Sequence, residues 1–265
     1  MKITLFTSNH PRHLSLIEDL SDICEELFVI QEVTTLYPGV FSDIYSASEL
    51  HQAYFNKMHQ SEEKYFGRAR FLLKDNVRFF SAKSGDISHV EFEQLEPAFQ
   101  SDYYVVFGAS FIKNRLIDFL IENNAVNIHM GVSPYFRGAA CNFWALYKRR
   151  PDMIGATIHL LSRGLDSGNM LFHALPVHAR YQPFDIGMAA VRSAHKGLCH
   201  HIKNQTLFEL SPKPQDKDKE ILYTKKVEFD ELVIKKFLDD MPTSDEVLSG
   251  LGEQNEDDFL RPFYG

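Results

Sequence analysis

Three polar residues in the middle of the chain have the types and spacing that acyl-group chemistry requires. Asn127 and His129 lie two residues apart at the exit of the apolar run 125–128, so on a strand their side chains point to one face. Asp166 lies farther along, in a glycine-flanked turn. An amide and a charged imidazole can stabilise a tetrahedral oxyanion, while a carboxylate keeps the imidazole charged and collects protons. The set predicts acyl transfer to an amine.

The same residues also have an ordinary structural interpretation. Asn-x-His at the end of a strand is a common turn-capping pair, and the sequence Gly-Leu-Asp-Ser-Gly at 164–168 is a common turn. Spacing alone therefore leaves the function open.

A longer set of residues resembles the formyltransferase family that uses 10-formyltetrahydrofolate. The family pattern has Asn-x-His, a proline after a short loop, a basic residue followed by glycine, an aromatic residue on a helix, and Asp-x-Gly after the next strand. This chain has these residues in the same order: Asn127, His129, Pro134, Arg137, Gly138, Trp144, Asp166 and Gly168. The resemblance implies that Asn127, His129 and Asp166 are catalytic and that no metal is needed.

Two positions depart from this pattern. Gly131 stands where the family usually has serine, which removes loop hydrogen bonds but no catalytic group. Cys141 stands where the family has proline, and we interpret it as a small buried residue in the first turn of a helix. With Cys24 and Cys199 it makes three distant cysteines, which argues against a disulfide framework and a zinc knuckle.

The resemblance also assigns segments to the two substrates. In the family, the segment after the strand expected at 103–107 lines the pteridine pocket. The folate contacts implied here are Gly108, Ala109, Ser110, Phe111, Ile112 and Leu165. Glycine after a strand is also ordinary turn chemistry.

The polar loop after the first strand lies beside the phosphate of the amine substrate in the family. Ser8, Asn9 and Arg12 are therefore expected to bind the acceptor. The start of a helix there is a natural anion site, although simple helix capping explains the same residues.

The chain of 265 residues, 44% hydrophobic, is long enough for one α/β domain and a small appendage. Alternation at 2–7, a helical stripe over 14–27 and a strand at 28–30 give a βαβ start, which predicts a parallel sheet. The resemblance implies a Rossmann-like formyltransferase fold with a mainly parallel, mixed sheet flanked by helices. A composition shift near residue 207 predicts a catalytic domain at 1–205 and a small C-terminal subdomain or tail at 206–265.

Periodicity predicts the remaining elements. Strands are expected at 77–80, 103–107, 125–128, 154–161 and 169–177, and helices at 142–147, 182–203 and 231–241, with another opening at 108–112. The segment 37–76 is expected to be helical and aromatic. It could stack on a nucleotide base or pack on the sheet, and its role stays open.

A net charge of −8 disfavours a nucleic-acid partner. No run of about 18 apolar residues exists, and the first residues predict a strand rather than a signal peptide. We expect a cytoplasmic protein without membrane partners, and leave a homodimer open.

Three acceptor classes are known for the family that the chain resembles. Its methionyl-tRNA enzymes carry a larger C-terminal domain and basic surfaces, and its glycinamide ribonucleotide enzymes usually have a glycine-rich loop after the first strand. By elimination, and from the loop 7–13 and the short tail, the chain most resembles sugar-nucleotide N-formyltransferases. The resemblance implies transfer from 10-formyltetrahydrofolate to the amine of a nucleotide-linked amino sugar, in surface polysaccharide (O-antigen) synthesis. The alternatives are a formyltransferase that acts on another amine, methionyl-tRNA or glycinamide ribonucleotide, a non-catalytic folate- or nucleotide-binding module, and an interaction protein.

Overall fold

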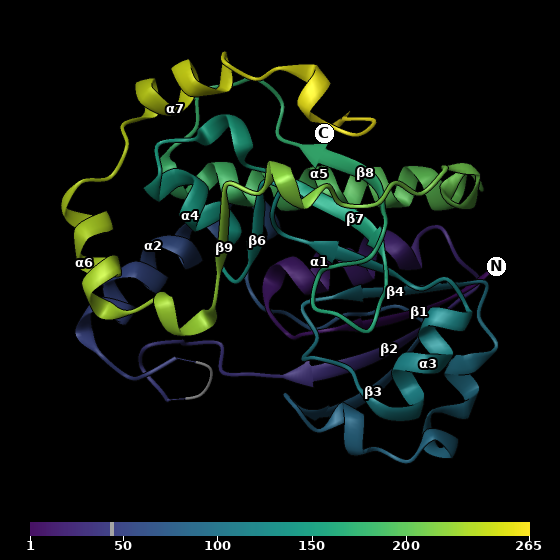
Figure 1. Cartoon of the computed structure of the whole chain (residues 1–265). Helices are drawn as coiled ribbons and strands as arrows, with labels where there is room; N and C mark the ends of the chain where they lie inside the picture. The colour runs from purple at the N-terminus through teal and green to yellow at the C-terminus, as the bar shows by residue number, and fades with distance from the viewer. Residues whose placement is uncertain (43–44) are drawn as a thin grey trace.

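The computed structural model describes residues 1–42 and 45–265 and is built around one eight-stranded sheet (Figure 1). The spatial order is β10-β8-β7-β5-β4-β1-β2-β3. The strands are β1 (Lys2–Thr7), β2 (Glu26–Val33), β3 (Val77–Lys83), β4 (Tyr103–Phe107), β5 (Val126–His129), β7 (Ala156–Leu160), β8 (Met170–Leu175) and β10 (Phe263–Tyr264). Of these eight described strands, β7 alone runs antiparallel to its neighbours, so the predicted mainly parallel, mixed sheet is confirmed.

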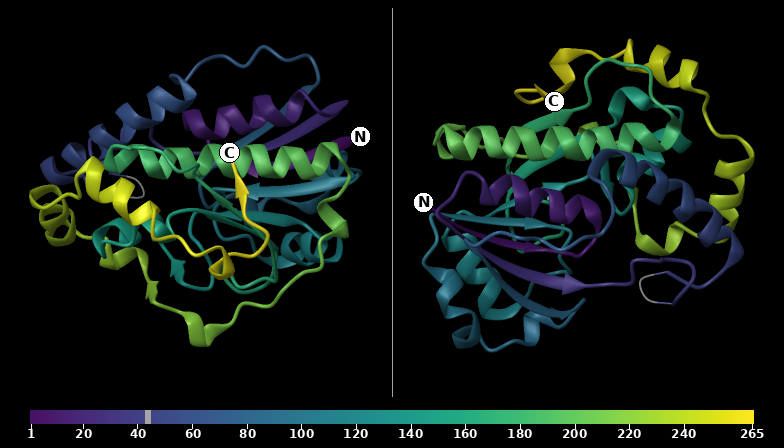
Figure 2. Two further views of the ribbon diagram at one scale, coloured as in Figure 1. Left: turned by 90° about the horizontal axis from the view of Figure 1, so that it is seen from above. Right: turned by 180° about the vertical axis from the view of Figure 1, so that it is seen from behind.

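Helices cover both faces of the sheet because alternate strand residues point to opposite sides. On one face, α1 (Pro11–Ser21) and α5 (Pro183–Lys203) lie next to each other (Figure 2) and share a core cluster with Ile3 and Leu5 of β1. On the other face, α3 (Asn114–Glu122) belongs to a second cluster that includes Phe6. The sheet is therefore the middle of three layers.

A third core cluster joins α2 (Glu49–Phe66), α4 (Cys141–Tyr147), α6 (Glu231–Asp239) and α7 (Ser244–Leu251). Helix α6 lies beside α2, although the two are far apart in the sequence (Figure 1). The C-terminal residues also return to the rest of the molecule through strands. A short β9 (Leu222–Thr224) pairs with β6 (Phe136–Gly138), and β10 extends the main sheet beside β8.

Several predicted elements have different bounds in the structure. The helix expected at 14–27 ends at Ser21, because Leu27 is a buried residue of β2 paired with β1. The segment 37–76 contains only α2, and residues 43–44 lie outside the described part of the chain. Residues 108–112 do not open a helix, since α3 starts at Asn114. The structure also has α7 and β10, which periodicity did not predict.

Among the described residues, the helices are all too short or too polar to cross a lipid bilayer.

Candidate active site

The strand ends place the three predicted catalytic residues in one cleft. Strand β5 carries Asn127 and ends at His129, and Asp166 lies in the loop between β7 and β8. All three line a cavity of about 470 Å³ at the carboxyl ends of β1, β4 and β5. This is where open α/β sheets bind their ligands.

His129 and Asp166 form a largely buried ion pair. The Nδ1 atom of His129 lies 3.2 Å from Oδ2 of Asp166, and the two side chains are 7% and 15% exposed. Burial opposes charge on both groups, but their mutual attraction and hydrogen bond outweigh it. The pKa of His129 is consequently raised well above its ordinary value, and the pKa of Asp166 is lowered. The imidazole is therefore held in its charged form, with Nε2 as a second donor.

Asn127 is held by two acceptors. Its Nδ2 atom donates to Oδ1 of Asp166 at 3.1 Å and lies 3.0 Å from Nε2 of His159. The Nδ1 atom of His159 lies 2.8 Å from the carbonyl oxygen of Leu160, which can only accept, so the tautomer with its hydrogen on Nδ1 accepts from Asn127 at Nε2. Both amide hydrogens of Asn127 are thus engaged, and a formyl oxygen would have to share one of them.

His159 was not predicted as part of the site. It is 1% exposed and lies directly opposite Asn127 in the antiparallel pairing of β5 with β7. The sequence contained a signal, because the alternation of the strand expected at 154–161 already put a histidine there. The register that brings the two residues together depends on the fold.

The second unpredicted contact comes from Cys141. The expected burial in the first turn of a helix is confirmed, since Cys141 is 2% exposed at the start of α4. Its Sγ atom also lies 3.4 Å from Nε2 of His129 and 3.4 Å from the carbonyl oxygen of Gly138. A thiol is a weak hydrogen-bond partner, so a substrate oxygen could replace it at Nε2.

Gly131 makes room for this thiol contact. A Cβ atom at position 131 would lie 2.5 Å from Cβ of Cys141 and 2.8 Å from Nε2 of His129. Gly131 and Cys141, the two departures from the family pattern, are therefore coupled. Any side chain at position 131 would overlap Cys141 and the imidazole of His129.

The Asp166 loop is fixed from two sides. A Cβ atom at Gly168 would lie 1.7 Å from the carbonyl oxygen of Leu160, so only glycine fits. Gln215, from the C-terminal region, donates through Nε2 to the carbonyl oxygens of Asp166 at 2.8 Å and Gly168 at 3.0 Å. The Asp166 loop is therefore positioned partly by the C-terminal region.

The predicted folate residues all line cavities beside Asn127 and Asp166. A small cavity of about 90 Å³ next to Asp166 is lined by five of them: Ala109, Ser110, Phe111, Ile112 and Leu165. The sixth, Gly108, lines the larger cleft. Gly108 has φ +73°, and a Cβ atom there would lie 2.3 Å from the ring of His13, so the position requires glycine.

Ser110 uses its polar groups within the protein. Its hydroxyl donates to Oε1 of Glu32 at 2.8 Å, and its amide donates to Oε2 of the same carboxylate. Glu32 is 1% exposed and also accepts from the amide of Gly85 at 2.8 Å. Ser110 therefore shapes the loop, and Glu32 anchors it.

The predicted acceptor residues are only partly brought to the cleft. Ser8 and Arg12 line it, whereas Asn9 does not and instead bonds through its side chain to the backbone of Thr34. Arg12 donates through Nη1 to Oε1 of Glu62 at 2.7 Å, and its backbone amide donates to the same oxygen at 3.2 Å. A carboxylate of α2 thus lies at the start of α1, where the sequence predicted a phosphate.

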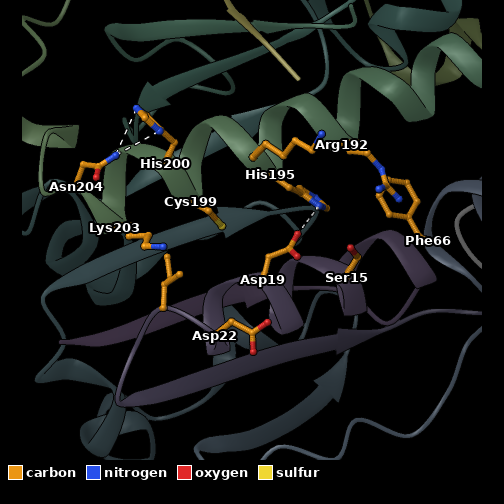
Figure 3. A pocket seen from close by; sticks show the side chains of 12 residues that line it. Ser15, Asp19, Asp22, Phe66, Arg192, His195, Cys199, His200, Lys203 and Asn204 are labelled. Carbon is orange, nitrogen blue, oxygen red and sulfur yellow. Dashed lines mark hydrogen bonds and ion pairs between the residues drawn. The ribbon is translucent and has the colours of Figure 1, made fainter.

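Another cavity, of about 480 Å³, lies between α1 and α5 (Figure 3). Asp19 of α1 and His195 of α5 point toward each other across it, with 3.8 Å between Oδ2 and Nδ1. Burial lowers the pKa of His195 to about 3. None of the predicted site residues lines this cavity.

Within residues 1–42 and 45–265, no group of three or more His, Cys, Asp or Glu side chains is arranged to hold a metal ion.

Comparisons with known proteins identify the family of the chain. A sequence profile described as "Formyl transferase" matches residues 54–202, more than half of the chain. The chain is 29% identical over 117 residues to a methionyl-tRNA formyltransferase of Synechocystis sp., covering 44% of this chain and 35% of the relative. The match thus spans about a third of that relative.

Solved structures share the fold at low sequence identity. A sugar N-formyltransferase from Shewanella sp. superposes with a TM-score of 0.52 and 16% identity, covering 100% of this chain and 92% of the other. WlaRD, a sugar 3N-formyltransferase solved in the presence of dTDP and 5-N-formyl-THF, has a TM-score of 0.51 and 14% identity, covering 87% of this chain and 72% of the other. On the profile match and the shared fold, the chain belongs to the formyl transferase family.

Proposed function

We propose that this protein transfers the formyl group of 10-formyltetrahydrofolate to the amine of a nucleotide-linked amino sugar, in the cytoplasm, as a step of surface polysaccharide (O-antigen) synthesis. The observation that carries the proposal is the buried ion pair of His129 with Asp166 beside Asn127, in a cleft at the carboxyl ends of the strands. A non-catalytic binding module would have no use for a charged imidazole aimed at the cleft.

The acceptor class is supported by the fold comparisons. The Shewanella sugar N-formyltransferase covers the whole of this chain. WlaRD was solved with a nucleoside diphosphate and a formylated folate, the two kinds of ligand proposed here. The net charge of −8 also disfavours an RNA acceptor.

The chemistry follows from the orientation of the imidazole. The neutral acceptor amine attacks the formyl carbon, and the carbonyl oxygen becomes an oxyanion. The Nε2–H group of His129 donates to this oxygen in place of the thiol of Cys141, and Asn127 donates to it by sharing the hydrogen that faces His159. The carbon–N10 bond then breaks, giving the formamide and tetrahydrofolate.

Asp166 has two tasks in this scheme. At rest it keeps His129 charged, and its lowered pKa makes it a weak base. Once the attacking nitrogen has become the acidic ammonium of the tetrahedral intermediate, that proton moves to Asp166, directly or through water, and is passed on to the departing N10. The loop at Gly108, Ala109 and Ser110, with Leu165, would hold the pteridine ring beside this centre.

Methionyl-tRNA is the second candidate acceptor, because the curated relatives are methionyl-tRNA formyltransferases. Glycinamide ribonucleotide is the third acceptor class implied by the family. The same assay separates all of them.

The test is to incubate the purified protein with 10-formyltetrahydrofolate and a panel of acceptors, and to follow the release of tetrahydrofolate. The panel contains amino-sugar nucleotides, methionyl-tRNA and glycinamide ribonucleotide, and His129→Ala is the inactive control. We expect turnover with an amino-sugar nucleotide. Turnover with methionyl-tRNA alone would overturn the acceptor, and no turnover with any acceptor would overturn formyl transfer.

A further inference from the structure

A second cavity opens beside the catalytic imidazole. It has a volume of about 260 Å³, and five residues line both it and the catalytic cleft: Arg12, Tyr45, Phe55, Met58 and Met130. Met130 directly follows His129 in the chain. A group bound next to the imidazole can therefore extend into this cavity, which we name the aromatic chamber.

The walls of the aromatic chamber are rings from three distant parts of the chain. Tyr54 belongs to α2, Phe143 to α4, and Phe229 and Phe237 to the C-terminal region. The ring centroids of Phe143 and Phe229 are 4.8 Å apart, those of Phe143 and Phe237 are 4.9 Å apart, and those of Tyr54 and Phe229 are 5.2 Å apart. Such contacts fix the rings against one another. The aromatic segment that contains α2 thus contributes a wall of a cavity.

The charged and amide side chains on the chamber wall are already engaged. Arg12 is bound by Glu62, which is 0% exposed. Asn142 donates through Nδ2 to the carbonyl oxygen of Gly155 at 3.0 Å and accepts from its amide at 3.2 Å. An occupant of the chamber therefore meets ring faces and methionine side chains rather than free charges.

Glu62 also changes what can bind at the start of α1. Its Oε1 atom accepts from the amide of Arg12, one of the helix N–H groups that would otherwise bind an anion. A phosphate placed there would face a buried carboxylate at close range and would have to displace it.

The size of the chamber limits its occupant. Pockets that bury a drug-sized ligand have volumes of about 300–1,000 Å³, and the aromatic chamber has about 260 Å³. This is room for one substituted six-membered ring and not for a nucleotide. The charged part of a sugar nucleotide would then lie outside the chamber.

We infer that the aromatic chamber is the specificity subsite for the acceptor. It binds an uncharged ring through an apolar face or a methyl group of that ring. Glu62 excludes acceptors that need a phosphate site at the start of α1. The inference rests on the proposed formyl transfer, and it defines which amines reach the catalytic centre. A hydroxyl group on the edge that enters the chamber would lose its water, and the polar side-chain groups left for it on the described wall are the hydroxyls of Tyr45 and Tyr54 rather than a charged or amide partner.

Two acceptors that differ by one hydroxyl test the chamber. These are dTDP-4-amino-4,6-dideoxyglucose and dTDP-4-amino-4-deoxyglucose, compared by kcat/KM for tetrahydrofolate release and by calorimetric binding. Since an apolar pocket discriminates against an added hydroxyl by up to about 100-fold, we expect the dideoxy sugar to be preferred by ten- to a hundredfold. Glycinamide ribonucleotide, the phosphate-bearing acceptor, should not be formylated.

Phe229→Ala and the milder Phe229→Leu should reduce this preference at least threefold, because they remove ring surface from the chamber wall. Phe259→Ala is the matched control, since Phe259 is 7% exposed against 6% for Phe229 but does not line the chamber. It should leave the preference unchanged.

The failures can be told apart. Equal kcat/KM for the two sugars, or a preference that survives both Phe229 substitutions, overturns the chamber while formyl transfer stands. Formylation of glycinamide ribonucleotide overturns the exclusion by Glu62. If neither sugar binds and neither is formylated, the proposed acceptor and the inference drawn from it both fail.

Discussion

Replacing Asp166 by Asn removes a charge from the site while keeping the shape of the side chain. The substitution tests whether the Asp166 carboxylate is what keeps the His129 imidazole charged. Two unit charges 3.2 Å apart attract by about 5 kcal/mol at an effective dielectric constant of about 20. This value is an upper limit, because burial of the imidazolium acts in the opposite direction. Without the carboxylate, burial lowers the pKa of His129, and the neutral imidazole predominates at pH 7.

The loss of a charged donor at the oxyanion should cost about 3–4 kcal/mol of barrier, or roughly 10²- to 10³-fold in kcat at pH 7. The pH profile should change as well. In the wild type the raised pKa of His129 preserves the charged form above the ordinary value of 6.5, and activity falls only as the pH rises through that higher pKa. In Asp166→Asn this fall should move to lower pH, so part of the rate returns on acidification.

The assay is kcat/KM for tetrahydrofolate release between pH 5.5 and 9. Asp185→Asn is the matched control, because Asp185 is also a buried, ion-paired carboxylate, 2.5 Å from Nζ of Lys64, but does not line the catalytic cleft. The control should keep the wild-type profile. If Asp166→Asn retained the wild-type rate and the wild-type profile, the carboxylate would have no part in charging the imidazole.

Three further substitutions test how the site is held. Cys141→Ala should move the fall of activity at high pH to lower pH, because the thiol helps to stabilise the charged imidazole. Cys141→Ser should return the fall to its wild-type position. If both variants kept the wild-type pH profile, the thiol would have no effect on the imidazole. Glu32→Gln should raise KM for the folate about tenfold with little change in kcat, since it loosens the Ser110 loop; a changed kcat with normal KM would contradict this. Gly168→Ala should reduce kcat at least a hundredfold in a folded protein, because its Cβ would overlap the Leu160 carbonyl and displace the catalytic loop; normal turnover would show that the loop can adapt.

Local patterns were sufficient to predict that three polar residues lie together at the strand ends. Asn127 and His129 share a strand face because side chains alternate along any strand, and the glycines around Asp166 mark its turn whatever the rest of the fold. The strands β1 and β4 were predicted with the bounds that the structure has. Each is a short apolar or alternating run bounded by turn residues, so the sequence itself marks where the strand begins and ends.

Contacts between distant segments could not be predicted in the same way. His159 and Cys141 reach the catalytic pair only through sheet register and through the packing of α4. Glu62 lies on a helix of ordinary polar composition, and nothing within that helix indicates that it covers the start of α1. Periodicity also missed β10, whose two residues are too few to show any alternation.

The proposed mechanism requires that His129 is a charged donor beside the formyl oxygen, held in that state by Asp166. The most direct measurement is an NMR titration of the imidazole in protein labelled at histidine with ¹³C and ¹⁵N, with His129→Gln used to assign its signals among the 12 histidines. We expect His129 to carry both ring hydrogens at pH 7 and to titrate above 6.5. A neutral His129 at pH 6.5 in the wild type would contradict the mechanism.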